Sequence, residues 1–138
     1  AWGRLSLEYR RPVARGRELF GNLVPWNEVW TPAADSAVLF TTTAPLEVAG
    51  RDLDAGSYSL WIVPTEEGPW TVVFSSAARV FHAPYPGEES DALRIEIAPG
   101  TAPHVESVQF TFPWAEGEST ELHFQWGTTV MAIPIRVR

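Results

Sequence analysis

Apolar side chains recur at every second position over most of this chain. Residues 58–62 and 93–97 show the pattern clearly, with Arg94 and Glu96 at the polar positions of the second segment. A period of two is typical of a β-strand with one buried and one solvated face, as in antiparallel sheets. The same alternation occurs in Leu5-Leu7-Tyr9, Val38-Phe40, Trp70-Val72-Phe74, Val108-Phe110-Phe112, Leu122-Phe124-Trp126 and Met131-Ile133-Ile135-Val137.

Turn signals separate these segments, among them Ala49-Gly50, Pro99-Gly100 and Gly127-Thr128, in a chain with 12 Pro and 10 Gly. No segment has a convincing helical period, and residues 17–23 are expected to form one turn at most. The pattern predicts an all-β fold over residues 1–138: a single-domain antiparallel β-sandwich of about eight to ten strands. A jelly-roll-like arrangement and a small barrel are the alternatives.

Strand patterns extend almost to both chain ends, from near Arg4 to Arg138. Terminal strands can pair with a second copy at a sheet edge, so a homo-oligomer through edge strands is one expectation. Pro134, Arg136 and Arg138 would oppose such pairing at the last strand, because proline cannot donate to a ladder and like charges repel.

The segment Tyr9–Trp30 has neither period and crowds arginines and aromatic residues together. A compact domain rarely keeps so long an irregular segment unless it has a function. We expect it to form one long N-terminal loop that caps the sandwich.

Composition indicates a globular protein, with 45% hydrophobic residues and 7 Trp in 138 residues. Cysteine is absent, so the sequence does not fix the redox compartment. No apolar run approaches the roughly 20 residues that span a bilayer. The chain begins at Ala1 rather than Met, which favours an exported protein, periplasmic, at the cell surface or extracellular, whose signal has been removed.

The formal net charge of -7 argues against a nucleic-acid or anionic-membrane partner, because both need a cationic surface. The basic residues are nevertheless concentrated near the start of the chain, and all of them are arginine. Arginine binds carboxylate and phosphate through two parallel hydrogen bonds, although a GC-rich genome would also favour arginine over lysine. The basic residues of the opening segment are Arg4, Arg10, Arg11, Arg15 and Arg17.

A set of short strings resembles bacterial domain-of-unknown-function family 2911. They are Tyr9-Arg10-Arg11-Pro12, Gly16-Arg17, Phe20-Gly21, Leu23-Val24-Pro25, Val29-Trp30, Ala55-Gly56-Ser57-Tyr58-Ser59-Leu60, Pro64, Trp70-Thr71-Val72 and Trp126-Gly127. The resemblance covers essentially the whole chain and is specific in order and spacing. It implies an all-β domain, typically exported in bacteria, and carries no established activity.

The chain departs from the family pattern at three places. Asp35-Ser36 stands where relatives have Asn-Glu, Arg10 stands where they have serine, and Phe81-His82 replaces Trp-Gly. If the Asn-Glu pair were catalytic in relatives, Asp35-Ser36 would preserve only part of it.

The opening segment, joined to Asp35 and Ser36, is the first candidate site. Arg11 and Arg17 are suited to bind an anion, Trp26 and Trp30 to pack against an apolar ring, and Asp35 to accept a hydrogen bond. Alternatively, the arginines hold the loop in place and the tryptophans fill one end of the sandwich.

The segment 80–87 is the second candidate because it carries His82 and Tyr85 beside two prolines. A histidine with a pKa near neutrality can act as a general base, and a tyrosine as a donor. The alternative is a stiff exposed connector.

No metal and no cofactor are predicted. His82, His104 and His123 lack the usual ligand spacing, and Glu121 with His123 would make at most a weak site on a polar strand face. A nucleophile elbow, a phosphate loop and a dinucleotide fingerprint are absent from the sequence.

We therefore expect a non-enzymatic binding module for a small polar ligand or a partner surface. A cofactor-independent hydrolase or isomerase using Asp35, His82 or Tyr85 is the first alternative. A structural subunit that assembles through sheet edges or terminal strands is the second.

Overall fold

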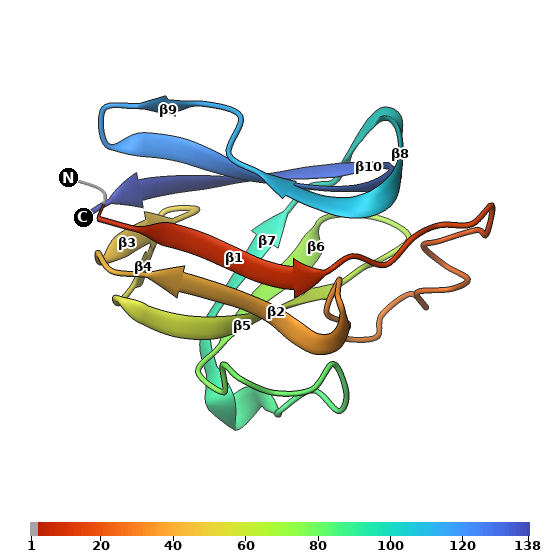
Figure 1. The fold of residues 1–138 in the computed structure, drawn as a ribbon, viewed down its shortest axis with the longest axis horizontal. Coiled ribbons are helices and arrows are strands. Elements are labelled where there is room, and N and C mark those ends of the chain that lie inside the picture. Colours follow the sequence, from red (N-terminus) through yellow and green to blue (C-terminus); the bar gives the residue numbers. More distant parts are fainter. Residues whose placement is uncertain (1–2) are drawn as a thin grey trace.

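Two antiparallel sheets lie face to face in the computed structural model, which describes residues 3–138 (Figure 1). The strand order of the first sheet is β1 (Leu5–Arg10), β2 (Ala34–Thr42), β5 (Gly56–Val63), β6 (Trp70–Ser75) and β7 (Asp91–Ile97). The order of the second is β4 (Arg51–Leu53), β3 (Leu46–Val48), β10 (Ser119–Val137) and β8 (Gly100–Thr111), with β9 (Ala115–Glu116) paired to β10. The predicted all-β sandwich is confirmed, and the sheets do not close into a barrel.

The alternating pattern produces the main core between the sheets. In the β5–β6 ladder Leu60 lies opposite Phe74 and Ile62 opposite Val72, and all four side chains are fully buried. Phe124 of the second sheet is buried in the same core. Each such side chain contributes about 1.5–3 kcal/mol of transfer free energy, so burial at the alternating positions is the main favourable contribution to folding.

Strands β3 and β4 were not predicted from the sequence. Each has three residues, too few to show a period, and they are joined at Ala49 and Gly50, whose φ angles are 48° and 80°. Two consecutive left-handed residues form the tight hairpin turn that matches the twist of the strands.

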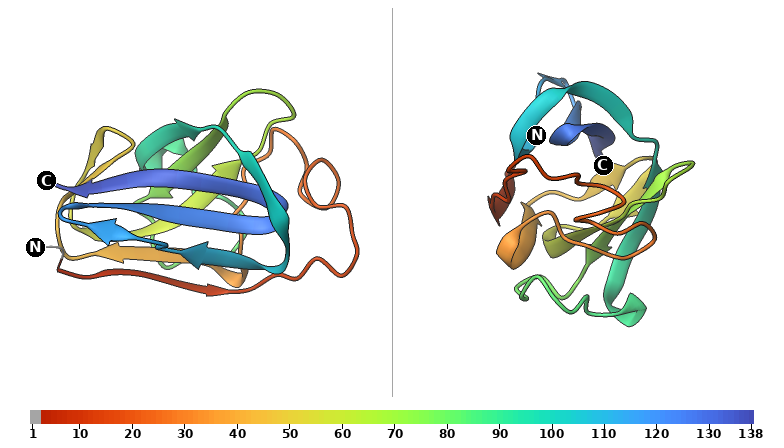
Figure 2. Two further views of the ribbon diagram at one scale, coloured as in Figure 1. Left: turned by 90° about the horizontal axis from the view of Figure 1, so that it is seen from above. Right: turned by 90° about the vertical axis from the view of Figure 1, so that its right-hand side faces the viewer.

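Strand β10 folds back near Gly127, which has φ 58°. Its two halves run side by side in Figure 2, and the N–H of Val137 donates to the carbonyl of Glu118 at 2.9 Å. The last strand is therefore interior, since it also pairs with β3. Our expectation that Pro134 and Arg136 protect an open last strand is wrong, because the Pro134 carbonyl accepts from Ala49 and Arg136 pairs with Glu47.

Residues 11–33 cross one end of the sandwich as an irregular loop (Figures 1 and 2). Single antiparallel bridges, Val13 with Ser107 and Trp30 with Ile62, attach it to the two sheets. No helix forms in this part of the described chain, as expected, and the one helical turn in residues 3–138 is η1 (Glu88–Ser90). None of the described helices is long and apolar enough to cross a bilayer.

A second, smaller cluster lies on the outer face of the first sheet. Ala37, Trp61 and Val73 are buried there, with Val80 and Tyr85 packed against them. The indole N–H of Trp61 donates to the hydroxyl of Ser59, so the polar group of this tryptophan is satisfied. The connection between β6 and β7 thus covers part of a face that would otherwise be solvated.

Candidate functional site

The guanidinium of Arg17 binds the loop that carries it. Nε donates to the carbonyl of Ala14 at 2.9 Å and Nη2 to the carbonyl of Val13 at 2.7 Å. The same loop is tied to β8, because the N–H of Ala14 donates to the carbonyl of Glu106 and the N–H of Arg15 to its carboxylate, both at 2.8 Å. Arg17 therefore holds its own loop in place, which is the alternative to anion binding that the sequence left open.

The aromatic residues of the loop pack against one another at the end of the core. Trp30 stacks on Trp126 with ring centroids 5.8 Å apart, and Phe20 meets both rings edge-on. Trp26 lies edge-on to Trp70 at 6.2 Å. The tryptophans therefore fill the end of the sandwich, although Trp26 and Trp126 also border a shallow hollow of about 370 Å³.

The residues grouped by sequence as the first candidate site are dispersed in the fold. Arg17 and Trp26 line that hollow, whereas Arg11 lines a groove beside β1. Asp35 is at the start of β2. None of the five main cavities in residues 3–138 is bordered by Arg11, Arg17, Trp30 and Asp35 together.

Asp35 is nevertheless the centre of a polar junction. Its carboxylate accepts from Nη1 of Arg10 at 3.1 Å, and its carbonyl lies 2.8 Å from both the N–H and Nδ1 of His82. Asp35 has φ 64°, a left-handed conformation that is uncommon outside glycine and more frequent for aspartate. The neighbouring Ser36 forms a single antiparallel bridge with Phe81. The segment 80–82 is thereby held against the start of β2.

A cleft of about 480 Å³ opens beside this junction, on the outer face of the first sheet. We call it the β1–β2 cleft. Its apolar floor includes Ala37 and Leu39, and its charged groups are Glu8, Arg10 and Arg79. The residues that line it are Glu8, Tyr9, Arg10, Ser36, Ala37, Leu39, Ala78, Arg79, Val80 and Phe81.

The cationic side of the cleft retains free hydrogen-bonding capacity. Arg79 makes no hydrogen bond or ion pair with any other described residue. Arg10 donates one hydrogen bond to Asp35, and the two side chains are 79% and 63% exposed, respectively. A guanidinium has five N–H donors, so Arg10 has donors left for a ligand. Phe81, 59% exposed, forms an apolar rim of the cleft, and its ring centroid lies 4.2 Å from that of His82. The cleft can therefore offer donors and an apolar surface together.

Tyr85 belongs to the β6–β7 connection, packs against the outer face of the first sheet, and does not line the cleft. Its ring lies edge-on to Trp61 at 5.5 Å, and its hydroxyl donates to the carboxylate of Asp91. The pKa of Tyr85 is raised, chiefly by burial and to a smaller extent by this hydrogen bond. Arg94 donates to the same carboxylate at 2.6 Å, and this bond raises the pKa of Arg94. These bonds join the β6–β7 connection to β7 and stabilise the cover over Trp61.

The other histidines pair with single carboxylates. His104 contacts Glu106 at 3.2 Å, and His123 contacts Glu121 at 3.0 Å. The pKa of Glu106 is lowered chiefly by the N–H of Arg15, and the pKa of Glu121 chiefly by His123. Residues 3–138 contain no group of three or more histidine, aspartate or glutamate side chains that could hold a metal ion.

The family resemblance noted in the sequence is confirmed by comparison with protein families. The chain matches the family described as "Protein of unknown function (DUF2911)" over residues 2–135. It belongs to the DUF2911 family. Neither a curated protein nor a solved structure matches this DUF2911 chain.

The sequence of this DUF2911 protein indicated some of the residues beside the β1–β2 cleft and not others. Ser36 lines it, and Asp35 and His82 adjoin residues that line it. Glu8, Arg10 and Arg79 were missed. Arg10 and Arg11 are successive residues at the end of a strand, so alternation alone places them on different sides and would have favoured one of them. Arg79 follows β6 in a segment without a period, and no local signal identifies it.

Proposed function

We propose that this protein is a binding module for a small organic carboxylate carried on an apolar body, held in the β1–β2 cleft. The observation that supports it best is that Arg79 and an apolar floor lie in the same cleft. Arg79 has no hydrogen-bond or ion-pair partner among the described residues. Its volume of about 480 Å³ is within the range of small-molecule sites, about 300–1,000 Å³.

The chemistry of the ligand follows from the lining. A carboxylate accepts two parallel bonds from a guanidinium, and such charge-assisted bonds are the strong ones in a partly desolvated site. Ala37, Leu39 and Val80 can cover an apolar body, and Phe81 can pack against its face. Asp35 keeps the guanidinium of Arg10 at the cleft through their ion pair. Glu8 would repel a second carboxylate at its side of the cleft, so a monocarboxylate is favoured.

A binding role is favoured over the alternative of a hydrolase or isomerase. His82 contacts Asp35 through the backbone carbonyl and not through the carboxylate. In acid–base catalysis by a histidine–aspartate pair, the carboxylate orients the imidazole. Tyr85, the third residue that this alternative names, donates its hydroxyl to Asp91 and does not line the cleft.

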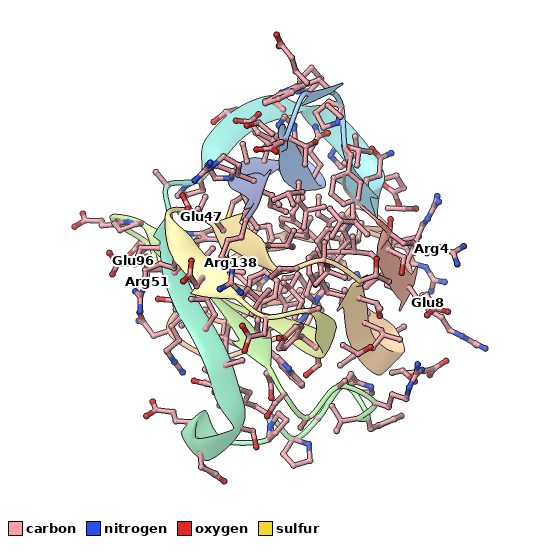
Figure 3. The ribbon with its side chains drawn as sticks, turned by 90° about the vertical axis from the view of Figure 1, so that its left-hand side faces the viewer. Arg4, Glu8, Glu47, Arg51, Glu96 and Arg138 are labelled. Atoms are coloured by element: carbon pink, nitrogen blue, oxygen red, sulfur yellow. The ribbon has the colours of Figure 1, made fainter. Side chains whose placement is uncertain are left out.

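Isothermal titration calorimetry with phenylacetate tests the proposal, with phenylacetamide as the matched neutral probe. We expect phenylacetate to bind and the amide to bind at least about tenfold more weakly, because a hydrogen bond to a charged group contributes about 1.5–3 kcal/mol. Arg79→Gln should weaken phenylacetate binding by a similar factor. Arg51→Gln is the control. The Arg51 side chain is also exposed and has no hydrogen bond or ion pair with another described residue, but it lies on the opposite side of the molecule from Glu8 (Figure 3).

Equal affinity for the acid and the amide, or equal effects of the two arginine variants, would contradict a carboxylate site in this cleft.

We also propose that the protein works outside the cytoplasm, in keeping with the compartment that the family resemblance implies. Fractionation of the native cells should then recover it with the periplasmic, surface or extracellular material. Recovery in the cytoplasmic fraction alone would contradict this.

A further inference from the structure

The outer edge of β1 is unpaired in the described structure. β1 pairs only with β2, and it is the first strand in the order of its sheet. The N–H of Thr43 donates to the carbonyl of Arg4 at 3.0 Å, so residue 4 belongs to a hydrogen-bonded pair. Because such pairs alternate along an antiparallel ladder, Ser6 and Glu8 also bond to β2. The backbone N–H and C=O groups of Leu5 and Leu7 therefore face the open edge.

A groove runs along this edge towards β8. It has a volume of about 640 Å³, and apolar residues (Leu5, Leu7, Tyr9, Phe110 and Phe112) line it together with polar ones (Ser6, Glu8 and Arg11). Phe112 is 39% exposed. An open edge beside exposed apolar side chains is a template for pairing with another strand.

The charges on β1 specify what kind of strand fits. Arg4 and Glu8 are exposed and project from the same side of the molecule, away from Arg51 and Glu96 (Figure 3). Neither side chain has a hydrogen bond or ion pair with another residue of the described chain. They are four residues apart with Ser6 midway, so an antiparallel copy of the same strand would place each opposite its complement.

We propose that two copies of this chain form a dimer by antiparallel pairing of their β1 strands about a twofold axis at Ser6. Arg4 of each copy then lies opposite Glu8 of the other, and Leu5 lies opposite Leu7. Since the edge-facing backbone groups are those of Leu5 and Leu7, each such pair exchanges both of its hydrogen bonds. The first sheets of the two copies, each of five strands, then form one continuous sheet.

Other registers are disfavoured by the sequence of β1. A shift by one residue would oppose leucines to polar residues and turn the apolar side outward. A twofold axis at Leu7 would oppose Arg4 to Arg10, and one at Glu8 would oppose Glu8 to itself. An axis at Tyr9 would reach past the end of β1 at Arg10, where the ladder with β2 is already irregular and Arg10 is paired with Asp35.

The closed twofold arrangement would also prevent open-ended growth at the exposed edge. An isologous interface uses the same patch on both copies, so pairing of β1 with β1 occupies both edges at once. Pairing of β1 with a different edge strand would instead leave one edge free on each copy and generate fibres.

Sedimentation velocity over a range of concentrations tests the proposal, with the protein free of ligand so that failure of the cleft proposal does not affect the result. The wild type should form a dimer, and Arg4→Glu and Glu8→Arg should each weaken it by about tenfold or more, because both symmetric pairs become like-charged. The double variant Arg4→Glu/Glu8→Arg should recover the wild-type dissociation constant.

Hydrogen exchange locates the interface. The amide protons of Leu5 and Leu7 should gain protection as the concentration rises, whereas those of Ser6 and Glu8 should be protected throughout. The proposal is overturned by a wild type that stays monomeric at high concentration, by a double variant as weak as the single ones, or by fibres. Protection of Leu5 and Leu7 only after addition of an extended peptide would overturn it in favour of a peptide partner.

Discussion

The packing of the opening segment against Trp26 can be tested with one methyl group. Gly21 has φ 89°, and a Cβ at this position would lie 2.4 Å from the indole Nε1 of Trp26. Real side chains do not approach so closely, so Gly21→Ala must displace the indole and its edge-on contact with Trp70. If the loop is the structural cap described above, its stability depends on this glycine.

Gly16 provides the matched control. It lies in the same segment with φ 70°, and a Cβ there would have no neighbour within 4 Å. Gly16→Ala measures the left-handed backbone cost alone, about 1–2 kcal/mol, reduced by about 0.4–1 kcal/mol because alanine also restricts the unfolded chain. Gly21→Ala adds the cost of overpacking, about 1–3 kcal/mol. We expect it to destabilise the protein by about 2–4 kcal/mol in total.

Urea unfolding followed by tryptophan fluorescence gives both free energies of unfolding. The informative quantity is the difference between the two variants, because the backbone and unfolded-state contributions are nearly the same in both. A difference below about 0.5 kcal/mol would refute a packed indole at Gly21, since it lies within the range of a neutral surface substitution.

Two further predictions concern other parts of the fold. The folded-state pKa of Glu121 is lowered, so its stabilising effect is present above the unfolded value of about 4.3 and is lost as pH falls through the lower folded value. Urea midpoints between about pH 3 and pH 7 should therefore depend less on pH in Glu121→Gln than in the wild type, and an identical profile would contradict the His123 contact. Trp61 is 1% exposed on the outer face of the first sheet, and Trp61→Ala should cost about 3–5 kcal/mol in chemical unfolding. A loss below about 1 kcal/mol would show that the β6–β7 connection does not cover it, and Trp61→Phe should have the smaller effect.

The sequence predicted the fold well where strands are long enough to show a period. The alternating segments correspond to β1, β2, β5, β6, β7, β8 and the two halves of β10. Three-residue β3 and β4 are fixed by their turn and by pairing with distant β10, which a local pattern does not reveal. The fold-back of β10 was anticipated as two segments around Gly127, but its interior position depends on the sheet order, which no local pattern contains.

The candidate site was harder to predict because side-chain direction decides it. Arg11 and Arg17 share a composition signal with Arg10, yet Arg17 binds carbonyls of its own loop and Arg11 borders the β1 groove. Trp30 resembles a binding platform in the sequence and is stacked on Trp126, more than ninety residues away. Only the fold shows which arginine has spare donors, because that depends on what its neighbours already accept.

The small outer cluster under the β6–β7 connection has a dynamic consequence for the cleft. Residues 78–81 form one wall of the cleft and belong to this connection, which packs on the small cluster of Ala37, Trp61 and Val73, whereas the opposite wall is formed by residues of β1 and β2, which pair with each other in the first sheet. Segments with few buried contacts detach at a lower free energy than the whole molecule unfolds. The cleft therefore has one wall that is part of the sheet and one wall that detaches at a lower free energy. A ligand that contacts both walls would slow the local opening of the connection without altering the rest of the sandwich.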